Sequence, residues 1–172
     1  MQILWKVSQE DVDKVKSFVS QHENNFFVQT RIRRNVNGQR EPVLIDAFWE
    51  HHVACLATTQ QRSGPGSNVN TFVNSRSFIL NYSACIEKGD SLETDAQQEL
   101  SNFRLRRSNT IAKEISQNIK FICKHWSEIK HSLDQIGLDA YVESERKAAN
   151  NIQANLRGFG PKQSRNLLQS LG

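Results

Sequence analysis

Hydrophobic residues recur at intervals of three and four along most of this 172-residue chain, which is the spacing of one face of an α-helix. The clearest case is the run Ile111, Ile115, Ile119 and Ile122, which predicts an amphipathic helix over residues 108–126. Residues 42–59 are instead apolar on nearly all sides, so we expect a buried helix there. Alternation of the kind typical of strands is almost absent. The pattern therefore predicts an all-α fold.

Capping and turn signals divide the rest of the chain into further helices. Ser8, followed by Glu10 and Asp11, is typical of a helix N-cap, and Ser67 is a candidate cap for a short helix. The expected helices are one after Ser8, then 26–36, 42–59, a short helix after Ser67, 78–86, 91–105, 108–126, 129–136 and 141–154. We interpret 1–41 as an N-terminal helical segment and 42–172 as the main domain, ending in a helical hairpin over 155–172.

That hairpin holds the most informative pattern, two glycines two positions apart between a helix end and a helix start. Gly158 and Gly160 allow positive φ angles and close backbone approach, and Pro161 suits the first turn of the second helix. The unpaired N–H groups at that helix start form a seat for a phosphate. With Leu156 and Ser164, the pattern resembles the helix-hairpin-helix motif of DNA-binding and DNA-repair proteins. The alternative is an ordinary αα-hairpin with a glycine turn.

Charge and cysteine content bound the class of protein. The formal net charge of +4 and the pI near 9.1 favour a polyanionic partner without requiring one. The three cysteines are far apart and lack a C-x-x-C pair, which predicts reduced thiols rather than a disulfide framework or a zinc site. No apolar run approaches about 18 residues, and no signal-peptide pattern opens the chain. We expect a cytoplasmic protein with no membrane partner, associated with the nucleoid if it binds DNA.

The loop after the buried helix adds a second signature. Gln60 and Gln61, followed by Arg62, come about a hundred residues before the glycine hairpin. This combination resembles the helix-hairpin-helix DNA glycosylase superfamily, which includes endonuclease III, the adenine glycosylases and the 8-oxoguanine glycosylases. The resemblance implies that Gln60 or Gln61 fills the gap left by a flipped base, and that Arg62 contacts the orphaned base or a phosphate. The alternative is an ordinary polar loop after a core helix.

Lys162 matches the position of the nucleophilic lysine in the bifunctional members of that superfamily. The resemblance implies that its amine attacks the sugar C1′ and forms a Schiff base that allows strand cleavage at an abasic site. Because only the neutral amine attacks, we expect partial burial at the helix start to lower the pKa of Lys162. The alternative is a lysine that contacts only phosphates. Gln163 and Arg165 join Gly158, Gly160 and Lys162 as the predicted DNA-binding residues of the hairpin.

The chain departs from the family pattern after the hairpin. In the superfamily an essential Asp lies beyond the end of the hairpin's second helix, whereas the 10 residues after Lys162 contain no acid. Three explanations stay open: a truncated chain, a second polypeptide that supplies the missing lobe, or a fold kept for binding after the chemistry was lost.

The histidines do not suggest a metal site. His51 and His52 are adjacent, so they face different sides of a helix and cannot share a tetrahedral site with His125 unaided. The resemblance implies a different ion: family hairpins often hold Na⁺ or K⁺ on turn carbonyls, here those around Leu156, Gly158 and Asn155. We expect no other cofactor.

The sequence thus favours a DNA-binding protein of the base-excision-repair type, acting as a DNA glycosylase or abasic-site lyase through Lys162. A non-catalytic DNA-binding or assembly subunit that retains the glycosylase fold is the first alternative, and a helical protein-interaction domain is the second. The expected partner is double-stranded DNA. An N-terminal group of arginines, Arg31, Arg33, Arg34 and Arg40, is either a solvated charged face or a further phosphate-facing patch.

Overall fold

The computed structural model describes residues 7–35, 42–75, 78–139 and 142–171. Within these ranges the regular elements are all helices, so the predicted all-α class is confirmed. The chain divides into two compact units, Met1–Arg40 and Glu41–Gly172. None of the helices in the described ranges combines the length and the apolar character needed to cross a bilayer.

The N-terminal unit consists of α1 (Gln9–His22) and α2 (Phe26–Asn35). The expected cap at Ser8 is confirmed. Its hydroxyl accepts the Asp11 N–H at 3.2 Å, and the Asp11 carboxylate accepts the Ser8 N–H at 3.0 Å, a reciprocal capping box. No residue of α1 is buried. Arg33 on α2 is exposed, and Arg40 lies outside the described residues.

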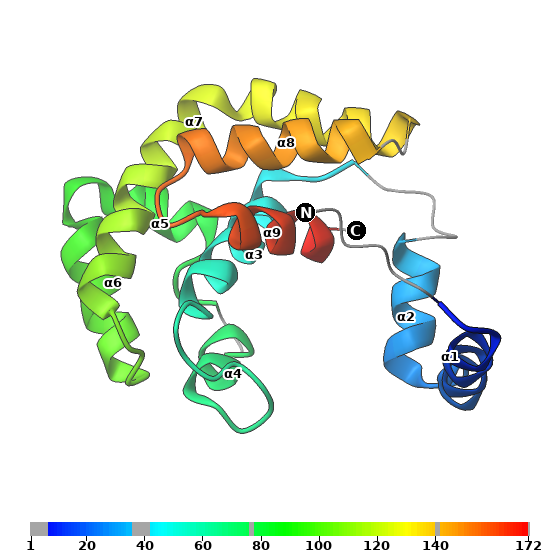
Figure 1. The fold of residues 1–172 in the computed structure, drawn as a ribbon. Helices are drawn as coiled ribbons and strands as arrows, with labels where there is room; N and C mark the ends of the chain where they lie inside the picture. The colour runs from blue at the N-terminus through cyan, green and yellow to red at the C-terminus, as the bar shows by residue number, and fades with distance from the viewer. Residues whose placement is uncertain (1–6, 36–41, 76–77, 140–141, 172) are drawn as a thin grey trace, which may run out of the picture. The chain divides into compact units, whose positions relative to one another are not determined.

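The second unit begins with α3 and is built around it. Its elements are α3 (Ile45–Ala57), α4 (Asn68–Val73), α5 (Tyr82–Lys88), the short 3₁₀ helix η1 (Gly89–Ser91), α6 (Leu92–Asn102), α7 (Ser108–Asp139), α8 (Val142–Asn155) and α9 (Pro161–Leu171). Helix α7 packs against α6 along its first part, and α8 runs beside its second part (Figure 1). Helix α9 packs on both α3 and α8.

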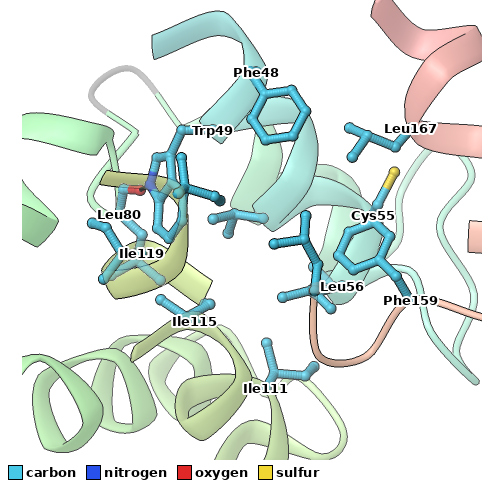
Figure 2. Packing of buried hydrophobic residues seen from close by; sticks show 14 of the residues in the cluster. Phe48, Trp49, Cys55, Leu56, Leu80, Ile111, Ile115, Ile119, Phe159 and Leu167 are labelled. Carbon is cyan, nitrogen blue, oxygen red and sulfur yellow. Dashed lines mark hydrogen bonds between the residues drawn. The ribbon is translucent and has the colours of Figure 1, made fainter. Parts of the chain in front are cut away.

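Helix α3 is the buried spine that its apolar sequence predicts. Phe48, Trp49 and Val53 are fully buried, and the Trp49 indole N–H donates to the Leu80 carbonyl at 2.8 Å, which ties α3 to the segment before α5. The isoleucine face of α7 packs into the same cluster, where Ile111 and Ile115 are fully buried (Figure 2). The hydrophobic pattern therefore predicted correctly that α3 and the isoleucine face of α7 are buried.

Helix α7 consists of two helical stretches that meet at a kink, close to the predicted division into helices over 108–126 and 129–136. Its 32 residues contain non-helical backbone angles at His125 (φ −116°, ψ 18°). The apolar positions Ile129 and Leu133 continue to face the core beyond the kink, so the chain resumes helical geometry instead of ending there.

Candidate nucleic-acid interface

The hairpin turn between α8 and α9 depends on Gly158. Its φ is +82°, and a Cβ at this position would lie 2.5 Å from Leu56 Cδ2 and 2.7 Å from Glu114 Oε2. A side chain would therefore be strained and would clash with α3 and α7. Gly160 differs, because a Cβ there would meet nothing within 4 Å. Buried Ser164 completes the turn by donating its hydroxyl to the Gly160 carbonyl at 3.1 Å.

A buried amide of α7 holds the turn in place. Asn118, 1% exposed, donates from Nδ2 to the Arg157 carbonyl at 2.9 Å and accepts the Arg157 N–H on Oδ1 at 2.7 Å. The same Nδ2 lies 2.8 Å from Nε2 of His52. Both amide hydrogens and the amide oxygen thus have partners, and the two backbone groups of Arg157 are satisfied as they would be in a sheet.

His52 is a structural residue between α3 and the hairpin. Its ring stacks on Trp49 at a centroid distance of 4.9 Å and on Phe159 at 5.0 Å. Complete burial lowers the pKa of His52 to about 3, so the ring is neutral at physiological pH. Because Asn118 donates to Nε2, the proton of the neutral ring is assigned to Nδ1, a buried nitrogen without a hydrogen-bond partner among the described residues. Phe159, the residue between the two glycines, thereby belongs to the buried cluster (Figure 2).

The second helix of the hairpin is bonded to the start of the glutamine loop, which we define as residues 58–62. Gln163 Nε2 donates to the Cys55 carbonyl at 2.8 Å and to Thr59 Oγ1 at 3.0 Å. Gln163 was predicted as a DNA-binding residue; its amide nitrogen is engaged inside the protein, where it joins α9 to the C-terminal end of α3. The contact brings together the two motifs that the sequence analysis singled out.

The two glutamines of the loop have different environments. Gln60 is exposed and has a φ of +59°, a conformation that non-glycine residues rarely adopt. Gln61 is half-buried, and both polar atoms of its amide are hydrogen-bonded. Nε2 donates to the Ala57 carbonyl, and Oε1 accepts the Arg106 N–H at 2.9 Å. Of the two glutamines, Gln60 is therefore the one whose side chain is exposed. Arg62 is exposed and lies with Nη2 3.4 Å from the Pro65 carbonyl.

The Gln61 contact leads to a segment that the sequence analysis missed, the arginine loop of residues 103–107 between α6 and α7. Arg104 and Arg107 have φ angles of +54° and +60°. Arg107 Nη2 lies 3.6 Å from Glu114 Oε1; burial raises the pKa of Glu114, and the Arg107 charge opposes that shift. The signal in the sequence was the group Arg104, Arg106 and Arg107 directly before a strong amphipathic helix.

The candidate nucleophile is exposed. Lys162 and Arg165 lie three positions apart on α9, and both are exposed. The partial burial expected for Lys162 is therefore wrong, because the apolar face of α9 is formed by other residues, Leu167 and Leu168 among them. Among the residues described, no group of three or more His, Cys, Asp or Glu side chains is placed to hold a metal ion. The cation site on the carbonyls of Leu156 and Gly158 stays a prediction.

Comparisons with models of protein families, with curated proteins and with solved structures find no match to this chain. The resemblance to helix-hairpin-helix glycosylases therefore rests on the residues of the hairpin and of the glutamine loop.

The two hairpin glycines should respond very differently to substitution. Gly158→Ala should lower the free energy of unfolding by about 2 to 5 kcal/mol, from the positive φ and the overlap with Leu56 together. Gly160→Ala should change it by less than about 0.5 kcal/mol, because the new methyl group meets open space. Urea unfolding followed by circular dichroism measures both. Equal losses in the two variants would contradict this account of the turn.

Proposed function

We propose that this protein binds duplex DNA through its glycine hairpin and its glutamine loop, and acts at abasic sites through Lys162 as a lyase of the base-excision-repair type. The observation that carries the proposal is the Gln163 contact, with Nε2 bonded to the Cys55 carbonyl and to Thr59 Oγ1. This contact joins the start of α9, for which we propose phosphate binding, to the loop that carries the exposed Gln60.

The start of α9 has the features of a phosphate site. The N–H groups in the first turn of a helix have no acceptor within the helix, and they carry the positive end of its dipole. Pro161 lacks an N–H, so the donors begin at Lys162, and open space at Gly160 allows close approach of a phosphate. The exposed side chains of Lys162 and Arg165 add two positive charges. This binding would be independent of base sequence and sensitive to salt.

Gln60 supports a role at a gap in the duplex. Its side chain is exposed next to two residues that are bonded elsewhere, Thr59 to Gln163 and Gln61 to Arg106. An amide inserted at an abasic position can hydrogen-bond to the unpaired base opposite and offset part of the lost stacking. The backbone strain at Gln60 fits this role, since strained residues concentrate at functional sites.

The lyase step requires an amine near C1′. The open-chain sugar of an abasic site carries an aldehyde at C1′; Lys162 Nζ adds to that carbon, water leaves, and an iminium ion forms. Loss of a C2′ proton to water then forms the C2′=C3′ double bond, expels the 3′ phosphate and breaks the strand. Base excision additionally needs an anion to stabilise the cationic sugar. We propose that such a carboxylate comes from a second polypeptide.

A non-catalytic DNA-binding subunit is the second candidate. The exposure of Lys162 favours it, because an exposed lysine on the first turn of a helix can contact phosphates without any covalent step. Both candidates share the same surface, so they differ only in whether Lys162 forms a covalent bond.

The glutamine loop gives a test of binding at gaps. Gln60→Gly removes the side chain and relieves the positive φ, so the variant should be at least as stable as the wild type. It should reduce the ratio of affinities for abasic and intact duplex by about tenfold, equivalent to about 1.4 kcal/mol. Fluorescence anisotropy on the two duplexes measures the ratio. An unchanged ratio would leave Gln60 as an ordinary surface residue.

Borohydride trapping tests the chemistry. Hydride reduces the iminium ion to a stable amine, so the wild-type chain should become covalently linked to abasic duplex, and Lys162→Gln should abolish the product. Lys147→Gln is the control, because it removes an exposed lysine from α8. Excision of a damaged base by these 172 residues alone should be negligible. DNA binding without any trapped product would favour the non-catalytic candidate.

A further inference from the structure

The arginine loop is held by backbone hydrogen bonds and contains strained backbone angles. The Arg104 N–H donates to the Ser101 carbonyl at 2.8 Å, and the Leu105 N–H donates to the Leu100 carbonyl at 3.0 Å. Leu105 is buried at 5% exposure and anchors the loop in the core. Among the residues described, the non-glycine positions with positive φ are Gln60, Arg104 and Arg107. All three lie in the glutamine loop or the arginine loop.

The arginine loop is fixed to its neighbours through its backbone. Gln61 Oε1 accepts the Arg106 N–H at 2.9 Å, and Asn68 Nδ2 donates to the Arg104 carbonyl at 3.3 Å. These bonds hold the main chain and leave the guanidinium groups of Arg104 and Arg106 exposed.

The three arginines of the loop differ in whether an acidic side chain pairs with them. Arg107 is paired with Glu114, and both side chains are largely buried, with 28% and 14% exposed. In the part of the chain that the structure describes, no ion pair joins an acid to Arg104 or Arg106. Two uncompensated charges thus lie just before the first turn of the long helix α7, whose dipole adds to the positive potential.

We propose that Arg104 and Arg106 bind backbone phosphates of the same duplex that the hairpin binds. This inference rests on the proposed function and adds a second point of attachment to it. Guanidinium groups donate paired N–H bonds to phosphate oxygens. Two arginines without an ion-pair partner, directly before a helix start, would therefore bind phosphate groups.

The glutamine loop is hydrogen-bonded to both proposed attachment points. Thr59 is bonded to Gln163 of the hairpin, and Gln61 is bonded to Arg106 of the arginine loop, so Gln60 lies between the residues that carry the two connections. The glutamine loop is thus hydrogen-bonded to both segments, and phosphate contacts at both would attach the duplex at two points. Two such contacts resist the rotation of the duplex that a single hairpin contact would permit.

The test is the salt dependence of affinity for an intact and an abasic duplex. Arg104→Gln/Arg106→Gln should lower the slope of log affinity against log salt by about 1.8, since each phosphate contact contributes about 0.9. Affinity at low salt should fall by at least about tenfold on both duplexes. Arg104→Lys/Arg106→Lys should retain the slope, because the charges remain.

The matched control is Arg146→Gln/Lys147→Gln, which removes two exposed positive charges from α8 and should leave the slope nearly unchanged. Circular dichroism confirms that each variant keeps its helices. If the wild type binds DNA and the Arg104→Gln/Arg106→Gln variant keeps the wild-type slope, the arginine loop binds no phosphate and this inference is overturned. If the wild type itself binds neither duplex, the proposed function fails first.

Discussion

The buried side-chain amide of Asn118 is the contact on which the candidate site depends. It hydrogen-bonds to three groups: the N–H and C=O of Arg157 and Nε2 of His52. In a dry interior, a polar group left without a partner costs about 1 to 3 kcal/mol, so the arrangement is held as a unit. With Arg157 fixed, Phe159 stacks on His52, and the start of α9 acquires a defined position on α3.

Two further amides extend this arrangement to the loops. Gln163 joins the hairpin to the end of α3, and Gln61 joins the glutamine loop to the backbone of the arginine loop. Amides suit these positions because each offers donors and an acceptor without a charge that burial would penalise. The hairpin, the glutamine loop and the arginine loop are thereby connected, and the exposed Gln60, Lys162, Arg104 and Arg106 are carried on their surface.

Hydrophobic periodicity predicted most of the fold, because helix burial follows directly from spacing. The faces of α3 and α7 and the caps at Ser8 and Ser67 are found where the sequence indicated. The contact between the hairpin and the glutamine loop was not predicted. Its physical cause, the bond between Gln163 and Cys55, links residues 108 positions apart, and local pattern carries no information about such a pair.

Contacts between residues far apart in the sequence also explain which parts of the site were not predicted. From the sequence alone, Asn118 is a polar residue within an amphipathic helix, and nothing local indicates its partner Arg157. The left-handed backbone of Arg104 and Arg107 has no glycine or asparagine to signal it, since the tertiary contacts of the arginine loop impose it. Lys162 was identified by position, but its exposure depends on which face of α9 packs against α3, and this was not predicted.

The most direct test of the central claim is hydrogen–deuterium exchange of the full chain with and without abasic duplex. The account predicts slower backbone exchange on DNA binding in three segments together: 58–62, 103–107 and 157–163. The helices α1 and α2 should show no comparable change. Protection confined to the hairpin, or absent from both loops, would contradict the view that the three segments form one DNA-binding surface.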